Sequence, residues 1–242
     1  MIQVGFKSDC GLRRKNNEDS CFVIPEDKIY IVADGVGGNN SGEVASRSAV
    51  SFIADYVKKN PLKDVRGRDS IKQYFIECIR KANSHIYKLA QSNAEYSEMA
   101  TTLVLAYVNR KTAYVVNVGD SRAYLMRADL LTQITEDHTY VNDLVKSGEL
   151  TADAARTHAK RNVITKAIGI EKDVVPDIFE VKLVHDDILL LCTDGLHGEV
   201  DDDTICDILG SGQQMSELCN RLITKANRCG GNDNITVVCV RI

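Results

Sequence analysis

Four acidic residues stand at or beside the ends of apolar, strand-like segments that lie far apart in this sequence. They are Asp34, Asp120, Asp194 and Asp233. We expect the apolar segments to form a sheet core, with the four carboxylates converging at one end of it. Carboxylates held within a few ångströms of one another repel and lose hydration, so they must protonate, pair with Arg or Lys, or bind a cation. Because carboxylate oxygens select hard ions, the sequence predicts a site for Mg²⁺, Mn²⁺ or Ca²⁺.

An ordinary turn is the competing interpretation of each Asp-Gly pair. Asp and Gly both favour turn conformations, so a turn explains any single pair better than a site does. Here the pairs at 34–35 and 194–195 both follow long apolar runs, 29–33 and 188–193. The recurrence of one arrangement favours a site.

A second charged cluster lies near the N-terminus. Arg14 belongs to a run of three basic residues, and Glu18 and Asp19 follow a few positions later. Taken alone, such a cluster is typical of a solvated surface. Taken with the four acids, it would place an anion-binding arginine beside cation-binding carboxylates, which is the combination that phosphate chemistry requires.

The composition is that of an ordinary globular protein. The 242 residues can bury a large core, and no low-complexity stretch marks a linker between domains. We therefore expect one domain, 1–242. A net charge of -4 without a basic stripe gives no reason to expect nucleic acid. The eight cysteines form no Cys-x-x-Cys pair and no secretory signal opens the chain, so we expect reduced thiols and a cytoplasmic protein. No apolar stretch approaches the roughly 20 residues of a membrane helix.

Several common catalytic motifs are absent from the sequence. The glycine-rich segment 35–42 lacks the Gly-Lys-Ser/Thr of a P-loop and the spacing of a dinucleotide fingerprint. There is no Gly-x-Ser-x-Gly elbow, and no cysteine has an arginine six positions later, as a thiol phosphatase loop would require. The acidic run 201–203 is better explained as a helix cap than as an aspartyl-phosphate motif.

Predicted strands and helices are clustered and do not alternate one for one. Apolar patterning predicts strands at 2–6, 20–24, 28–34, 101–108, 112–118, 123–126, 132–134, 177–183, 188–193 and 235–241. Helical periodicity predicts helices at 41–59, 70–91, 204–209 and 215–228. The polar segment 136–170 shows only short helical patches. This clustering favours antiparallel sheets covered by helices over a doubly wound parallel sheet.

A series of short blocks along the chain is found in the same order in one known family. The blocks are 8–9, 11, 14–19, 32–38, 42–46, 100–102, 118–124, 135–139, 161–169, 192–196 and 233–236. In this order the set resembles the metal-dependent Ser/Thr protein phosphatases of type 2C, especially their compact bacterial branch. The resemblance implies an α+β fold, a four-layer α-β-β-α sandwich of two mostly antiparallel sheets flanked by helices. It also implies a variable flap beside the site, at about 136–175.

The same resemblance implies a centre of two Mn²⁺ or Mg²⁺ ions. Asp34 would bridge the two ions, and the carbonyl of Gly35 would hold the second of them. Asp194 and Asp233 would complete the coordination of the first ion.

Four further residues receive roles from the resemblance. Glu18 and Asp19 would act on the metals directly or through bound water, and Asp120 matches a ligand of a third, weaker metal. Arg14 matches the phosphate-binding arginine of the family. Its planar guanidinium can hold two phosphate oxygens at once, which a lysine cannot reproduce.

The implied activity is hydrolysis of phosphoserine and phosphothreonine in proteins, by metal-activated water and without a covalent enzyme intermediate. The chain would oppose a Ser/Thr protein kinase in signalling, as a monomer whose partners are phosphorylated proteins and not nucleic acid or membrane. The main alternative is a catalytically silent member that binds phosphoproteins, disfavoured because Asp34, Asp194 and Asp233 are all retained. A metal-dependent phosphodiesterase or nuclease is more distant, because basic, aromatic-bearing grooves are lacking.

The sequence departs from the family pattern where a general acid is expected. Many eukaryotic members have a histidine where this chain has Val36, and many bacterial members have one where it has Asn39. Protonation of the leaving group would then fall to metal-bound water or to another histidine. His138 and His158, in or beside the flap, are candidates, although lone histidines are more often structural.

Overall fold

Two antiparallel β-sheets face one another in the computed structural model, which describes residues 2–38, 41–92 and 94–242. The first sheet has the strand order β1 (Gln3–Asp9), β11 (Ile235–Arg241), β10 (Ile188–Cys192), β7 (Arg122–Arg127) and β8 (Leu130–Gln133). The second has the order β2 (Asp19–Ile24), β3 (Ile29–Val36), β5 (Leu103–Asn109), β6 (Thr112–Val118) and β9 (Asp177–Lys182), with β4 (Ala100–Thr101) paired to β3.

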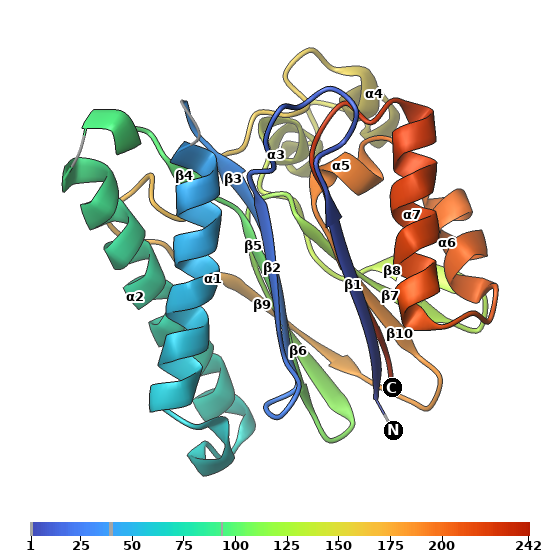
Figure 1. Ribbon diagram of the computed structural model, residues 1–242, viewed down its shortest axis with the longest axis horizontal. Coiled ribbons are helices and arrows are strands. Elements are labelled where there is room, and N and C mark those ends of the chain that lie inside the picture. Colours follow the sequence, from blue (N-terminus) through green and yellow to red (C-terminus); the bar gives the residue numbers. More distant parts are fainter. Residues whose placement is uncertain (1, 39–40, 93) are drawn as a thin grey trace.

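Helices cover both outer faces of this sandwich (Figure 1). The second sheet is covered by α1 (Ser41–Lys59) and α2 (Arg68–Ser92), and the first by α6 (Asp202–Gly210) and α7 (Met215–Cys229). Short elements complete the chain between these layers: the 3₁₀ turns η1 (Leu62–Asp64) and η2 (Ala94–Tyr96), and α5 (Asp194–His197). The predicted four-layer α+β sandwich is confirmed.

The central strands are buried on both faces, which explains their continuous apolar sequence. In β3, Ile29 and Ile31 pack with the residues of α1 and α2, whereas Tyr30 and Val32 pack in the core between the two sheets. The residues of β10 and β11 are divided in the same way between the inner core and the core under α6 and α7. Because successive strand residues point to opposite faces, one apolar run serves two layers.

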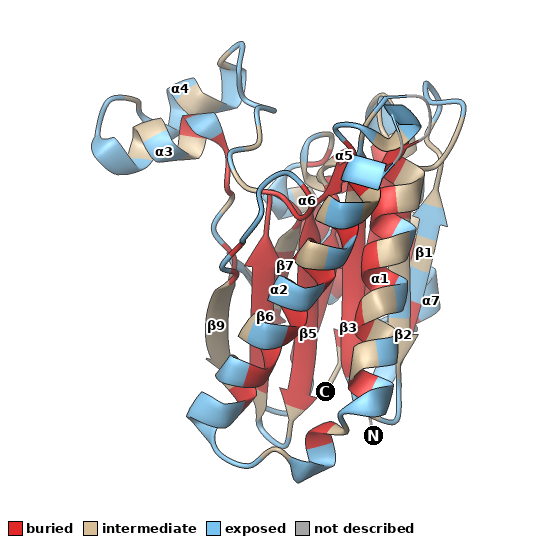
Figure 2. Ribbon diagram, turned by 90° about the vertical axis from the view of Figure 1, so that its left-hand side faces the viewer, coloured by how far each residue is buried: buried red, intermediate tan, exposed pale blue. Residues whose placement is uncertain are grey.

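The segment between β8 and β9 departs from the sandwich. It contains α3 (Tyr140–Ser147) and α4 (Ala152–Thr157), which Figure 2 shows standing away from the sheets. At the start of α3 the Thr139 hydroxyl accepts from the N–H of Asn142, and at its end Gly148 adopts a left-handed conformation with φ 79°. These local caps allow a short helix to form with little burial.

Two details of the chain differ from the expected elements. The strand predicted at 101–108 is interrupted at Thr102, because the N–H of Asp34 donates to the Thr102 hydroxyl and not to its carbonyl. Helix α5 was not predicted, since a single turn is too short to show helical periodicity.

The eight cysteines are free thiols, as expected. Among the described helices, none has both the length and the apolar character of a membrane span.

Candidate metal centre

The predicted acids gather at one end of the sandwich. Asp19 and Asp34 are direct partners in the ladder of β2 and β3. Asp194 opens α5 just after β10, Asp233 lies two residues before β11, and Asp120 lies between β6 and β7. Burial raises the pKa of Asp34 well above its usual range, and repulsion from the other four carboxylates raises it further. The topology therefore brings together acids from both sheets, as the sequence predicts.

Two threonines fix the backbone of Asp34. Its N–H donates to the Thr102 hydroxyl at 3.0 Å, and its carbonyl accepts from the Thr101 hydroxyl at 2.9 Å and from the Thr102 N–H at 2.8 Å. The two adjacent threonines therefore fix the chain at the point where β3 reaches the acid cluster. Neither threonine was assigned a role from the sequence, although both belong to one of the family blocks.

Gly35 allows β3 to approach the start of α1 closely. A Cβ atom on Gly35 would overlap the carbonyl of Gly42, and one on Gly42 would lie 2.7 Å from the carbonyl oxygen of Gly35 and overlap a carboxylate oxygen of Glu18. Both positions therefore require glycine. This contact places the Gly35 carbonyl and the Glu18 carboxylate side by side next to the first turn of α1.

Two carboxylates in the cluster have an oxygen without a partner. Oδ1 of Asp19 and Oδ1 of Asp194 are buried and accept no hydrogen bond from any described group. Burial raises the pKa of Asp19 to about 7, although the Thr193 hydroxyl donates to its Oδ2 at 2.9 Å. Burial, followed by repulsion from Asp233, raises the pKa of Asp194 to about 6. Unpartnered carboxylate oxygens with raised pKa values fit a bound cation, which would supply the missing interaction.

Arg14 lies at the rim of the cluster and pairs with Asp233. Nη2 of Arg14 is 2.7 Å from Oδ2 of Asp233, and the two side chains are 53% and 35% exposed. Although partial burial opposes the change, the charge of Asp233 raises the pKa of Arg14, and the charges of Asp34 and Asp194 add to it. The predicted anion-binding arginine is thus beside the predicted acids, and it already has a carboxylate partner.

Asn234 ties three segments of the cluster together, and sequence reasoning gave it no role. Its Oδ1 accepts from the N–H of Glu18 at 2.8 Å, while its Nδ2 donates to the carbonyls of Cys10 and Asn16, both at 2.9 Å. A side-chain amide suits this place because it offers an acceptor oxygen together with two N–H donors. The available signals were its position next to Asp233 and its place in the family block 233–236.

Two histidines flank the loop that carries Asp120. The N–H of Gly119 donates to Nδ1 of His138 at 2.9 Å, and Nε2 of His197 donates to the Asp120 carbonyl at 3.0 Å. Burial, followed by the charge of Arg122, lowers the pKa of His197 to about 3, so its imidazole is neutral at pH 7. Burial, followed by repulsion from Asp194, raises the pKa of Asp120 to about 7. No sequence motif singled out His197, because its position depends on α5.

The positions considered for a general acid differ in exposure and in hydrogen-bond partners. Val36 is 45% exposed and carries no ionisable group, and Asn39 lies outside the described residues. His138 is buried, and its Nε2 is 3.2 Å from Oδ2 of Asp177. His158 lies in the segment between β8 and β9, where its Nδ1 accepts a backbone N–H at 3.1 Å. Each of these two histidines therefore takes part in local hydrogen bonding.

In the described part of the chain, no three acidic, histidine or cysteine side chains already form a metal-coordinating group. Asp233 accounts for part of this, because Arg14 engages its Oδ2 and the N–H of Asn234 donates to its Oδ1 at 2.8 Å. The donor set nevertheless suits a hard cation, since it consists of carboxylate oxygens with a backbone carbonyl nearby. Each oxygen of Asp233 keeps a further lone pair, so a cation would compete with Arg14 for this side chain without excluding it.

A family model described as protein phosphatase 2C matches residues 12–232. The chain belongs to this family. It is 39% identical to the serine/threonine phosphatase stp of Listeria innocua, over 97% of this chain and 94% of the relative. It is 35% identical to the protein phosphatase PhpP of Streptococcus pneumoniae, over 99% of this chain and 97% of the relative. The predicted family and the predicted enzyme class, a metal-dependent Ser/Thr protein phosphatase, are confirmed.

Solved structures of protein phosphatase 2C members agree with this assignment. The serine/threonine phosphatase PstP/Ppp of Mycobacterium tuberculosis has a TM-score of 0.90 and 36% identity, covering 100% of this chain and 98% of that one. The catalytic domain of PstP in complex with two manganese ions has a TM-score of 0.86 and 34% identity, covering 99% and 97%. Since the family is metal-dependent, the acid cluster is the candidate metal centre of this phosphatase.

Proposed function

We propose that this phosphatase hydrolyses phosphoserine and phosphothreonine residues of proteins at the acid cluster and thereby opposes a Ser/Thr protein kinase. One observation carries the proposal: four carboxylates converge on Asp34, and two members of the cluster have buried oxygens without a described partner. Such a cluster needs cations, and Arg14 at its rim offers a group that binds anions. Cations and an arginine together suit a phosphate ester.

Two Mn²⁺ or Mg²⁺ ions would be held by residues of the cluster. We assign Asp34 to both ions, the Gly35 carbonyl to the second, and Asp194 and Asp233 to the first. The support is their shared position at one end of the sandwich and the chemistry of their oxygens. When bound, such ions supply a water of lowered pKa and positive charge beside the phosphoryl oxygens.

Three other acids complete this proposed centre. Asp120 would hold a third, weaker ion, in line with its place on a separate loop between the two sheets. Glu18 and Asp19 would act on the ions directly or through water. The unpartnered Oδ1 of Asp19 supports its inclusion, and the position of the Glu18 carboxylate beside the Gly35 carbonyl supports that of Glu18.

Arg14 would bind and orient the phosphoryl group. Its guanidinium is half exposed at the open side of the cluster, and its pairing with Asp233 keeps it close to the other acids. Two parallel N–H donors can hold two phosphate oxygens at once, which restricts the ester to one orientation. Such positioning lowers the barrier because the reacting groups no longer need to be brought together from solution.

We assign protonation of the leaving serine or threonine oxygen to water. Val36 stands where many family members have a histidine, and it has no proton to donate. The Nε2–H group of His197 is bonded to the Asp120 carbonyl, and both ring nitrogens of His138 are engaged within the fold. These histidines therefore serve as structural supports of the Asp120 loop in this proposal.

The proposal extends to the organisation of the whole chain. We propose one catalytic domain, 1–242, working as a cytoplasmic monomer on phosphorylated proteins, without nucleic acid or membrane partners. The segment 136–175 would be a flap that contributes to the choice of protein substrate. Its support is the contact of His138, at the start of this segment, with Gly119 beside Asp120. Figure 2 shows its helices standing clear of the sandwich, where a protein could reach them.

A phosphothreonine peptide assay with Mn²⁺, with Mg²⁺ and with chelator tests the assignment. We expect turnover with either metal and none with chelator. Asp34→Asn is expected to lower kcat by about 100-fold or more, because it removes charge from the centre of the cluster, while the circular dichroism spectrum stays that of the wild type. Metal-independent turnover would refute the metal mechanism, and near-normal activity of folded Asp34→Asn would refute the bridging role. A wild type that binds the peptide without turnover would be a silent family member.

A further inference from the structure

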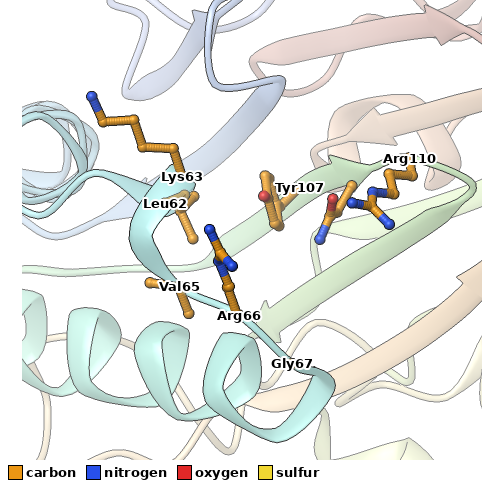
Figure 3. A pocket seen from close by; sticks show the side chains of 8 residues that line it. Leu62, Lys63, Val65, Arg66, Gly67, Tyr107 and Arg110 are labelled. Carbon is orange, nitrogen blue, oxygen red and sulfur yellow. The ribbon is translucent and has the colours of Figure 1, made fainter.

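A second candidate site lies at the opposite end of the sandwich from the acid cluster. A cavity of about 590 Å³ is formed there by η1, the chain leading into α2 and the turn between β5 and β6 (Figure 3). Its lining residues are Leu62, Lys63, Val65, Arg66, Gly67, Tyr107, Asn109 and Arg110. Strand β5 begins beside Thr102 at the acid cluster and ends at the cavity, so the two sites are roughly 20 Å apart.

The wall of this cavity carries three basic residues, Lys63, Arg66 and Arg110, and none of them forms an ion pair with a described acid. Two acids are nearby: Asp64 belongs to η1, and the charge of Asp27 adds to the effect of burial in raising the pKa of Tyr107. By contrast, Arg68 on the adjacent turn pairs with Glu180 at 2.5 Å. In Figure 3 Arg66 and Arg110 lie on opposite sides of Tyr107, whereas the ammonium of Lys63 points away from the cavity. Two arginines that share a cavity and form no ion pair create a local positive potential that attracts anions.

Tyr107 adds an unused donor inside the cavity. Its side chain belongs to a residue that is only 9% exposed, and its ring packs against Phe75 and Tyr114 with centroid distances of 5.7 and 6.2 Å. Within the described chain, no group forms a hydrogen bond with its hydroxyl. The hydroxyl oxygen keeps contact with solvent, since it is not one of the fully buried side-chain atoms that lack a partner. A ligand in the cavity could therefore take the place of water at this hydroxyl.

We propose that this cavity is a second anion site, which binds a small ligand with two adjacent phosphate groups. Arg66 and Arg110 would each hold phosphate oxygens through paired N–H donors, and the Tyr107 hydroxyl would donate to a third oxygen. Leu62 and Val65 form the apolar part of the lining. The volume is ordinary for a small-ligand pocket. The cavity shares no residue with the acid cluster, so the proposal does not depend on the proposed function.

Nuclear magnetic resonance of the magnesium-loaded protein tests the site. Pyrophosphate is titrated while the backbone amides of Gly67 and Arg110 are followed, with the amide of Gly35 reporting on the acid cluster. We expect saturable shifts at Gly67 and Arg110. A parallel titration with ADP distinguishes a free diphosphate from one carried on an organic group, and binding of either probe at these amides supports the site. No saturable shift there with either probe would overturn it.

Paired variants show whether the two arginines carry the binding. Arg66→Ala/Arg110→Ala is expected to weaken the affinity measured at Gly67 by at least about tenfold, since hydrogen bonds to charged groups are lost. Arg156→Ala/Arg228→Ala removes the same charge from two exposed arginines elsewhere and should leave that affinity unchanged. The response of Gly35 should be the same in both double variants. Equal affinities at Gly67 in the two double variants would also overturn the proposal.

Discussion

At the scale of single residues, the acid cluster shows how burial changes what a carboxylate can do. Burial raises the pKa of Asp19 to about 7 and that of Asp194 to about 6, and each keeps an oxygen without a described partner. Asp233 differs, because Arg14 and a backbone N–H satisfy its two oxygens. The same residue type is thus left open for a cation at two positions and engaged by protein groups at a third.

Arg14→Ala separates phosphate binding from metal binding. We expect KM for a phosphopeptide to rise about tenfold, because a charged two-donor contact is lost. The metal concentration for half-maximal activity should not rise, since the variant frees Asp233 from its present partner. Steady-state kinetics at varied peptide and varied Mn²⁺ concentrations measure both quantities.

The neighbouring Arg13 provides the matched control, because it is exposed and has no described ion pair. Arg13→Ala should leave KM within about twofold, as expected for a surface change of under about 0.5 kcal/mol. An unchanged KM in Arg14→Ala, or an equal rise in both variants, would count against the phosphate role of Arg14.

At the scale of elements, the segment 136–175, which we propose to be a flap, is fastened to the loop that carries Asp120. Arg122, at the start of β7, donates to Asp137 through Nε at 2.9 Å and Nη2 at 2.7 Å. One residue later, His138 accepts the buried N–H of Gly119. The flap therefore has a rigid base, although its helices stand away from the sheets. A strand pattern or a helix pattern alone shows neither of these two contacts.

Replacing His138 tests this connection. His138→Ala leaves the Gly119 N–H buried without its acceptor, which should cost about 1–3 kcal/mol and lower Tm by roughly 3–10 °C. Amide exchange in α3 should become faster, because the base of the flap is loosened. Thermal melts and hydrogen exchange read by mass spectrometry measure the two effects.

Two further variants decide whether the contact with Gly119 is the cause. His138→Asn should recover part of the lost Tm, since its Oδ1 can accept the same N–H. His158→Ala alters a histidine between β8 and β9 that is partly exposed, and it should change Tm little. Equal losses from His138→Ala and His158→Ala would contradict the proposed anchor.

At the scale of the whole molecule, the acid cluster couples stability to pH and to cations. Burial raises the pKa values of Asp19 and Asp120 to about 7 and that of Asp194 to about 6. Between about pH 4 and 7 the folded chain therefore holds protons that the unfolded chain releases. These three carboxylates lower stability as pH rises through this window, because the folded state then loses those protons at a cost. The lowered pKa of His197 acts in the opposite sense below about pH 6.5, where the unfolded chain binds the proton that the folded chain does not.

We expect the Tm of chelator-treated protein to fall between about pH 6.5 and pH 7.5, where Asp19 and Asp120 still lose protons and His197 no longer contributes. Saturating Mg²⁺ should reduce or reverse this fall, since a cation that binds only the folded state stabilises it and favours ionised carboxylates. Melts across this pH range, with Mg²⁺ and with chelator, test the linkage. A Tm that rises with pH in chelator would show that the cluster is not under electrostatic strain.

The sequence by itself determined the chemistry and the layers of this protein. The acids at 34, 120, 194 and 233 could be identified from their place at strand ends. Continuous apolar runs such as 29–33 indicated strands buried on both faces. The order of short motifs identified the family. These features are local, or depend only on the order of motifs, so they can be recognised in the sequence without knowledge of which residues are in contact.

Only the tertiary structure decided which groups meet. The pairing of Arg14 with Asp233 joins residues 219 positions apart, and the contacts of Asn234 join three segments that periodicity treats as unrelated. His197 and the basic cavity around Tyr107 likewise depend on how distant elements pack. The physical reason is that a pattern of apolar and polar residues reports which face of an element is buried. It does not report which partner that face will find.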